Sequence, residues 1–338
     1  MTGEENMVND LERFEKIDLR ELNNGKIVNY WSNWLNASKR VRINSSEVSL
    51  KWSIDRITIV GNLKKFHWVR DNLDVTELDF EQLWAVFEGK GIAKSTGKGW
   101  VLLDKYGENI AYAEVVKFDK TKGRIDFNPN KIRPFLHGSL KKFIHNLFVN
   151  PHFSRADVAC DIFNIPDDFI RQYRIVDPIS FKPIYGANGF LETAYWGSRS
   201  SERQVRLYNK KLEQMKKKEV VPEEVASWWR LEAQLRRAKA EEWASVIAES
   251  LDSFSSPHYF PDDMSAIEKA VITGLISNQD LWGELNRRTK YKYRNLLKEI
   301  AQNDELTQYL KASFSESMDD LKRELDTWLI GLDVTKND

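Results

Sequence analysis

The sequence predicts an α+β fold in which an antiparallel sheet with one polar face is followed by a helical C-terminal region. Strand-like segments separated by short turns fill residues 50–237, and amphipathic helical segments fill residues 239–330. Three of the strand-like segments also alternate apolar side chains with charged ones. An antiparallel sheet with one solvated face produces this alternation, because successive side chains of a strand point to opposite faces.

We expect three parts along the chain of 338 residues. Residues 1–48 have the pattern of a helical lead-in, residues 49–238 form the sheet domain, and residues 239–338 form a helical domain. The change from strand to helix near residue 238 sets the second boundary. The expected strands include KWSIDRITIVG, which a glycine would end, then WVLLD, NIAYAEVVKF and GRIDFN, with YGEN and TKG as turns, and KIRPFLHGSLKKFIHNLF is an expected helix.

Composition excludes several classes of protein. No apolar run is long enough to cross a membrane, and the polar, acidic start MTGEENMVND has no secretory core, so we expect a cytoplasmic protein with no membrane partner. The single cysteine, Cys160, excludes an internal disulfide framework and is expected to be a small buried hydrophobe. Net charge is zero, yet Lys and Arg crowd into residues 199–218 and 287–298, which leaves nucleic-acid binding open.

Three predicted strands share a face of unusual content. In residues 155–162, 204–210 and 230–236, side chains that are mainly charged, amide or phenolic alternate with apolar ones. If the strands lie in one sheet, carboxylates that suit Mg²⁺ or Mn²⁺ join arginines that suit phosphate oxygens. The face consists of Arg155, Asp157, Ala159 and Asp161, then Gln204, Arg206, Tyr208 and Lys210, then Arg230, Glu232, Gln234 and Arg236.

The same pattern is compatible with an ordinary solvated sheet whose strands form ion pairs, such as one between Asp157 and Arg230. Alternation alone leaves both interpretations open. It also selects no nucleophile, because the chain has 11 tyrosines and Tyr is a frequent strand residue.

The run from residue 192, ETAYWGSRSSERQVRLYNKKLE, resembles the signature of the replication initiation factor family, which includes staphylococcal-type plasmid rolling-circle initiators and related relaxases of mobile elements. SRADVACDIFN, WWRLEAQLRR and IDRITIVGN resemble the family's other strands, and LNRRTKYKYRNLL resembles its C-terminal region. The motifs stand in the family's order over roughly residues 50–300. The matching signature positions are Thr193, Tyr195, Gly197, Ser198, Arg199, Ser200, Arg206, Tyr208 and Lys210.

The resemblance implies a metal-dependent enzyme that nicks and rejoins DNA, with Tyr208 as the nucleophile of a 5′-phosphotyrosine intermediate. It implies Asp157 and Glu232 as ligands of Mg²⁺ or Mn²⁺, with Asp161 a less certain third. None of the five histidines forms the His-hydrophobe-His pair of other rolling-circle nucleases, which agrees with carboxylate ligands. The side chains expected to stabilise the phosphate charge are Arg206, Lys210 and Arg230.

The resemblance makes residues 49–238 the nicking domain and residues 239–338 the DNA-recognition domain. We expect the second basic cluster to begin a helix after Asn286 and to contact duplex origin DNA, although a solvated helix face is the alternative. Trp196 is a candidate for stacking on unpaired bases, against core packing. The expected DNA-binding residues are Arg199, Lys211, Arg236, Arg287, Arg288, Lys290, Lys292 and Arg294.

The family further implies a homodimer that loads a host UvrD-like helicase of the PcrA type. Two rival functions stay open. A relaxase that starts conjugative transfer would use the same residues on the same DNA chemistry. A catalytically inert origin-binding protein or repressor would keep the basic helix but would not need Asp157, Tyr208 and Glu232 together.

Overall fold

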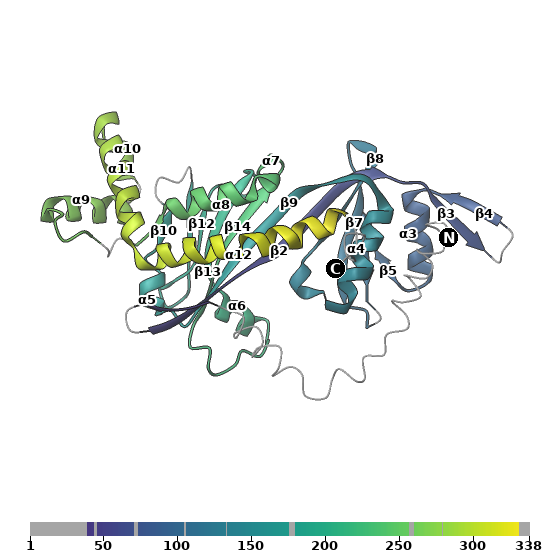
Figure 1. Cartoon of the computed structure of the whole chain (residues 1–338), viewed down its shortest axis with the longest axis horizontal. Helices are drawn as coiled ribbons and strands as arrows, with labels where there is room; N and C mark the ends of the chain where they lie inside the picture. The colour runs from purple at the N-terminus through teal and green to yellow at the C-terminus, as the bar shows by residue number, and fades with distance from the viewer. Residues whose placement is uncertain are drawn as a thin grey trace, which may run out of the picture.

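The computed structural model describes residues 39–43, 46–70, 74–104, 106–132, 134–175, 180–256, 260–278 and 280–330. An 11-stranded antiparallel sheet runs through the molecule in the order β11-β12-β13-β14-β9-β2-β8-β7-β6-β5, with β1 added to β2 (Figure 1). Its strands are β1 (Lys39–Ile43), β2 (Ser46–Leu63), β5 (Ala93–Ser95), β6 (Trp100–Leu103), β7 (Asn109–Val116), β8 (Asp119–Phe127), β9 (Phe148–Phe163), β11 (Phe181–Tyr185), β12 (Leu191–Trp196), β13 (Arg203–Asn209) and β14 (Trp228–Arg236).

The remaining strands form two small ribbons, β3 (Phe66–Arg70) with β4 (Asp74–Leu78) and β10 (Arg174–Ile175) with β15 (Phe254–Ser255). The helices are α3 (Phe80–Gly89), η2 (Pro129–Lys131), α4 (Pro134–Leu147), α5 (Asp167–Ile170), α6 (Lys210–Lys216), α7 (Ala238–Glu241), α8 (Trp243–Asp252), α9 (Ala266–Ser277), α10 (Leu281–Glu284), α11 (Arg287–Asn303) and α12 (Glu305–Ile330). A mixed fold with a large antiparallel sheet and C-terminal helices confirms the predicted class. No helix in the described ranges is long and apolar enough to span a membrane.

The two longest strands, β2 and β9, pair along most of their length and join the two halves of the sheet. Their register shifts at three places, between Ile54 and Arg56, between Thr58 and Ile59 and between Val60 and Asn62. Such bulges let long strands bend and twist without losing their pairing. At the first shift, Asp55 has no residue of β9 opposite it.

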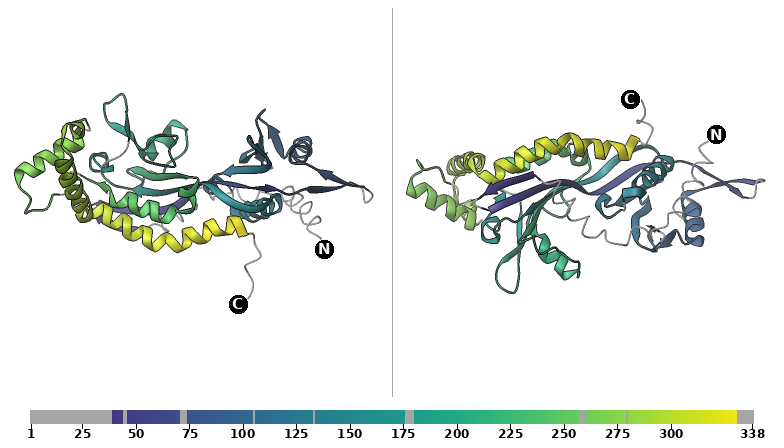
Figure 2. Two further views of the ribbon diagram at one scale, coloured as in Figure 1. Left: turned by 90° about the horizontal axis from the view of Figure 1, so that it is seen from above. Right: turned by 60° about the horizontal axis from the view of Figure 1, so that its bottom comes forward.

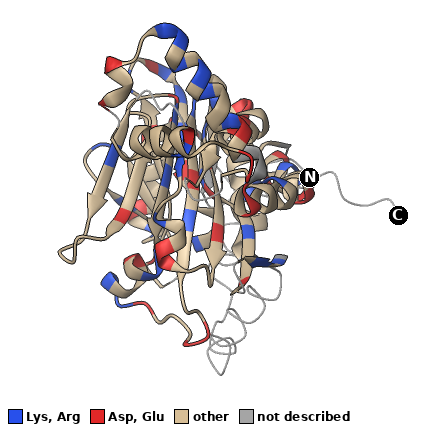
Figure 3. Ribbon diagram, turned by 90° about the vertical axis from the view of Figure 1, so that its left-hand side faces the viewer, with Lys and Arg blue, Asp and Glu red and all other residues tan. Residues whose placement is uncertain are grey.

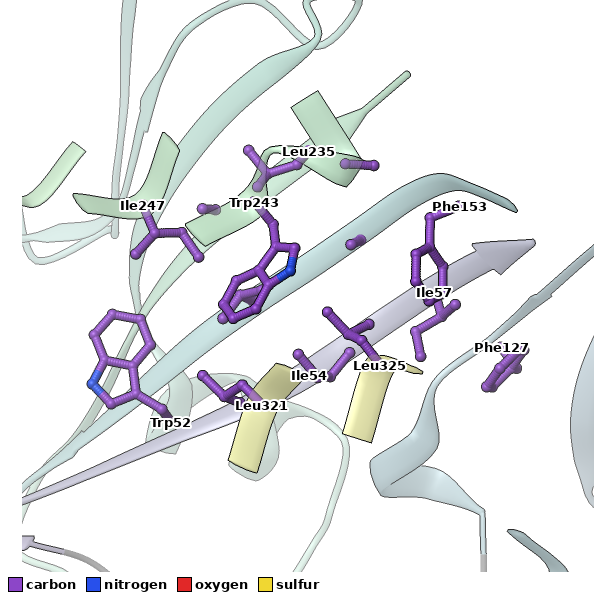
Figure 4. Close-up of a cluster of buried hydrophobic side chains, with 14 of the residues drawn as sticks. Trp52, Ile54, Ile57, Phe127, Phe153, Leu235, Trp243, Ile247, Leu321 and Leu325 are labelled. Carbon is purple, nitrogen blue, oxygen red and sulfur yellow. The ribbon is translucent and has the colours of Figure 1, made fainter. Parts of the chain in front are cut away.

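One face of the sheet is covered by α8 and α12, as the edge-on view of Figure 2 shows. The Trp52 indole donates a hydrogen bond to Ser313 Oγ at 2.9 Å and its ring lies 4.9 Å from that of Phe314, both on α12. Further along the helix, Leu321 and Leu325 lie over Ile54 on β2 (Figure 4). Full burial of such a side chain contributes about 1.5–3 kcal/mol, so α12 belongs to the sheet's core.

Helices α9 to α11 project from one end of the sheet and have a small core of their own, made by Ile272, Leu297 and Ile300 (Figure 1). The start of α11 confirms the sequence prediction, because the Asn286 side chain accepts a hydrogen bond from the Thr289 N–H at 2.9 Å. The helical C-terminal region therefore has two parts, a helix that completes the sheet's core and a projecting unit that begins at α9.

The prediction of a helical lead-in over residues 1–48 is wrong at its C-terminal end. Residues 39–43 and 46–48 are strand, in β1 and at the start of β2, with Lys39 paired to Leu50 and Ile43 to Ser46. These residues form a strand rather than a helix because pairing with β2 buries Val41 and Ile43 against the sheet. Residues 1–38 of the lead-in lie outside the described residues.

Gly61 does not end its strand, as the sequence suggested, and Gly123 is not in a turn. Both lie within strands, directly opposite each other in the pairing of β2 with β8. A Cβ on Gly61 would lie 2.6 Å from the Phe148 Cβ, and one on Gly123 would lie 3.1 Å from the same ring. The two glycines therefore make room for a buried Phe148, which a local reading of the sequence cannot show.

Candidate active site

The three polar strands meet on the face opposite α12, as predicted. In the pairing of β13 with β14, Tyr208 lies opposite Arg230 and Arg206 lies opposite Glu232. In the pairing of β14 with β9, Arg230 lies opposite Asp161. Opposite positions point to the same side of a sheet, so these side chains share one surface. We call this surface, carried by Asp157, Asp161, Tyr208, Arg206, Arg230 and Glu232, the charged face.

Glu232 is at the centre of the charged face and only 1 % exposed. Its Oε2 accepts a hydrogen bond from the Arg206 Nη2 at 2.5 Å and lies 3.5 Å from the Tyr208 hydroxyl. Its Oε1 accepts from the Gln234 amide at 3.0 Å. The carboxylate is thus desolvated, held in position, and is an acceptor for the phenol proton.

Tyr208 is 5 % exposed, with its ring between two cations. The Arg206 guanidinium lies 4.5 Å and the Lys210 ammonium 5.5 Å from the ring centroid. Burial raises the pKa of the phenol well above its ordinary value; Glu232 raises it further, and Arg230 opposes both. The phenol is therefore neutral at physiological pH and needs a base or a cation to become a nucleophile.

Asp157 is also buried, and the Arg155 guanidinium donates to its Oδ1 at 2.8 Å and its Oδ2 at 2.5 Å. Burial, together with the charges of Glu232 and Asp55, raises the pKa of Asp157 to about 6 against the opposing effect of Arg155. Desolvated carboxylates therefore repel one another here. A bound cation would relieve that repulsion.

Asp161 is fully buried, and its carboxylate oxygens accept three hydrogen bonds. Arg230 donates to its two carboxylate oxygens from Nε and Nη2, each at 2.7 Å, and the Trp228 indole donates to Oδ1 at 2.6 Å. The cross-strand pair suggested by the sequence as an alternative, Asp157 with Arg230, is therefore not the one that forms. Asp161 positions Arg230, which fits a structural ion-pair partner better than a metal ligand.

Asp55 is a member of the charged face that the sequence analysis missed. Its Oδ1 accepts from the Arg230 Nη1 at 2.5 Å, and its charge acts on Asp157. A signal was present in IDRI, where two successive polar residues, Asp55 and Arg56, interrupt the alternation between Ile54 and Ile57. That interruption marks the bulge that turns Asp55 toward the charged face.

In the described residues no three His, Cys, Asp or Glu side chains lie close enough together to hold a metal ion. The donor type nevertheless suits Mg²⁺ or Mn²⁺, because Asp55, Asp157 and Glu232 offer oxygen ligands. In the structure arginines occupy these oxygens, Arg155 on Asp157 and Arg206 on Glu232. The carboxylates expected as ligands are thus buried, and arginines balance their charge in this structure.

The remaining expected residues fall into different settings. Arg199 is exposed and Arg236 half-buried beside the charged face, whereas the Lys211 ammonium is bound to the carbonyls of Val225 and Ala226 at 2.7 and 3.1 Å. Lys210 pairs with Glu213. Trp196 is 3 % exposed and stacks on Phe181 in the core, so the core-packing alternative is the correct one. Cys160 is buried, as expected.

The basic cluster of α11 divides in two. Arg287 and Arg288 are exposed, and Tyr291 is 68 % exposed beside them. Lys292 instead pairs with Glu268 at 2.9 Å, Lys290 approaches the Gly283 carbonyl at 3.4 Å, and Arg294 lies over the Trp282 ring. Figure 3 marks the Lys and Arg positions that recur along this helix. Its first turn therefore offers the surface that is open to a ligand.

The chain is similar to known replication initiation proteins. The family model described as replication initiation factor matches residues 186–318. A replication initiation protein of Staphylococcus aureus is 33% identical over 286 residues, which is 82% of this chain and 84% of that protein. Another from the same organism is 33% identical over 284 residues, 82% of this chain and 85% of the relative.

Among solved structures, the rolling circle replication initiator protein from Geobacillus stearothermophilus aligns with 67% of this chain and 84% of its own, at 19% identity and a TM-score of 0.37. The relatives in S. aureus, similar over four fifths of the chain, decide the assignment: this protein belongs to the replication initiation factor family.

Proposed function

We propose that this protein initiates rolling-circle replication by cutting one strand of origin DNA with Tyr208 and later rejoining it. The observation that carries the proposal is the position of the Tyr208 hydroxyl, 3.5 Å from a buried carboxylate and on a face rich in arginine. Cleavage of a phosphodiester needs a nucleophile, a proton acceptor and positive charge to neutralise the phosphate, and the charged face has all three.

The chemistry would run through residues of this chain. The Tyr208 oxygen attacks the scissile phosphorus in line while its proton moves to Glu232. A new P–O bond to the tyrosine replaces the P–O3′ bond, which leaves a 5′-phosphotyrosine and a 3′ oxygen that takes a proton from water to become a free 3′-OH. Arg206 and Lys210 flank the tyrosine and stabilise the extra charge of the transition state. Because the phosphotyrosine keeps the bond energy, a DNA hydroxyl can reverse the step.

A divalent cation, Mg²⁺ or Mn²⁺, would be held by Asp157 and Glu232. Asp161 is unsuited to be the third ligand because Arg230 and Trp228 occupy its oxygens. We propose Asp55 in its place, because Arg230 holds only its Oδ1 and its charge already acts on Asp157; the three carboxylates would have to move closer together than they lie in the structure to share a cation. When bound, the cation would add positive charge at the scissile phosphate.

We further propose that the exposed first turn of α11 contacts duplex origin DNA through phosphates, with Arg287 and Arg288 as the main contacts. From family resemblance we also propose a homodimer and loading of a PcrA-type helicase. A relaxase of a conjugative element would use the same chemistry, and a gene beside its own origin on a small plasmid would favour replication over transfer.

A nicking assay tests the proposal. Supercoiled plasmid carrying the origin is incubated with the protein and Mg²⁺ or Mn²⁺, and the products are separated with and without protease. We expect open circles with protein attached to a 5′ end. A repressor would bind the origin and leave the DNA supercoiled, and that result would refute the enzymatic assignment.

A further inference from the structure

Beside the charged face the sheet carries an open cavity of about 610 Å³, within the size range of ligand sites. Strands β11 to β14, β9 and β2 and the β12–β13 turn contribute to it. Two of the lining arginines, Arg155 and Arg206, are the ones that hold Asp157 and Glu232. The cavity therefore adjoins the buried carboxylates of the charged face, and these two arginines lie between them and the cavity.

The charged side chains that line this cavity are all basic. Among the described residues its lining contains no carboxylate. Lys182 and Arg199 are exposed, and neither forms an ion pair within the described ranges. The basic side chains that line it are Arg56, Arg155, Lys182, Arg199, Arg206 and Arg236.

Arg56, Arg155 and Arg206 are paired with Asp126, Asp157 and Glu232, and two further observations indicate that the cavity can still accept an anion. Burial lowers the pKa of Arg236, and the like charges of Arg155, Arg56 and Arg199 lower it further, so several guanidinium groups repel one another there. The Arg206 Nε is buried and has no hydrogen-bond partner among the described residues. Clustered cations and an unsatisfied donor are relieved together by an anion that accepts hydrogen bonds.

We propose that this cavity binds phosphates of single-stranded DNA next to the scissile phosphate, with the half-buried Tyr195 ring as a stacking surface for one base. Tyr195 lies opposite Arg206 in the pairing of β12 with β13, so a base on its ring would have phosphates within reach of the arginines. A single strand is the better occupant, because an unpaired base can stack on a tyrosine ring, whereas a base stacked inside a duplex cannot. The inference rests on the proposed function for the location of the scissile phosphate.

Binding can be measured apart from cleavage. In a Tyr208→Phe background, fluorescence anisotropy gives the affinity for a labelled thymidine oligonucleotide of about eight residues. We compare Lys182→Gln and Arg236→Gln with Arg323→Gln, an exposed arginine on α12 at the opposite face. The two cavity variants should each lose about tenfold in affinity and about 0.7 in the slope of log K against log salt, while the control does neither.

A second oligonucleotide with neutral methylphosphonate linkages separates phosphate contact from loss of folding. On it the cavity variants and the control should bind equally weakly. A persistent difference on the neutral strand, or equal affinities of all three variants on the charged one, would overturn the phosphate assignment. Tyr195→Ala should weaken both strands alike, and unchanged binding would overturn the stacking role. If the wild-type protein cuts no origin DNA but these binding results hold, the proposed function fails and the binding site stands.

Discussion

Tyr208 and Glu232 meet across neighbouring strands, with the phenol oxygen 3.5 Å from a carboxylate oxygen that is itself buried. The contact exists because β13 and β14 pair in a register that puts Arg206 opposite Glu232 and Tyr208 one pleat repeat away on the same face. A phenol whose pKa is raised by burial thus has one fixed proton acceptor. The predictions below follow from this arrangement.

Tyr208→Phe removes only the hydroxyl, whose one hydrogen bond among the described residues is the long one to Glu232. Nicking and covalent attachment should be lost, while origin binding stays within about twofold of wild type. Gel assays of supercoiled DNA and of protein-bound 5′ ends measure both. A covalent adduct in this variant would refute the assignment and make Tyr195 the next tyrosine to test.

Asp157→Asn and Glu232→Gln keep the shape of each side chain and remove its charge. Each should slow cleavage by about 10²–10⁴-fold, since a proton acceptor or cation ligand is lost. Initial rates at increasing Mn²⁺ concentration measure the effect. Asp168→Asn is the control, because Asp168 is exposed and, among the described residues, its carboxylate pairs with Arg171 alone, away from the charged face. Either variant cutting at the wild-type rate would exclude that residue from the reaction.

Asp55 and Asp161 should differ although both contact Arg230. Asp161→Asn breaks a fully buried bidentate pair and should cost about 3 kcal/mol of stability in urea unfolding. Asp55→Asn should cost less stability but raise the Mn²⁺ concentration that half-maximal cleavage requires. The opposite result, a metal defect confined to Asp161→Asn, would restore Asp161 as the third ligand.

The two basic regions should have separable tasks. Replacing Arg287 and Arg288 by Ala should weaken binding to duplex origin DNA and lower its salt slope by about one unit per lost phosphate contact. Cleavage of a short single-stranded nick-site oligonucleotide should not change. Arg206→Ala should do the reverse, because that arginine touches Glu232 and Tyr208. Loss of both activities in both folded variants would show one continuous DNA surface.

Glu324 on α12 should make stability depend on pH. Burial raises its pKa to about 7, against the opposing charge of Lys141 on α4. The folded pKa exceeds the unfolded one, so the stabilising effect of the protonated form is present at low pH and is lost as pH rises through about 7. Glu324→Gln should therefore raise the melting temperature by about 3 °C at pH 8 and leave it nearly unchanged at about pH 4, below the ordinary pKa of a glutamate. Equal shifts at both pH values would contradict this.

The sequence by itself determined which residues could share the charged face. A strand has a period of two, so the alternation places Tyr208 with Arg206 on one side of residues 204–210, and Arg230 with Glu232 on one side of residues 230–236. Asn286 likewise marked the start of α11, because a cap depends on its own neighbours. Both are local properties, which sequence patterns record directly.

Only the tertiary structure decided which charges meet. Arg230 of β14 binds Asp161 of β9 and Asp55 of β2, because these three strands are paired in one register with a bulge at Asp55. The same holds for residues 39–43, which become strand only through their pairing with β2. Register depends on contacts between segments far apart in the chain, whose free energies add up over the whole sheet, so no local pattern specifies it.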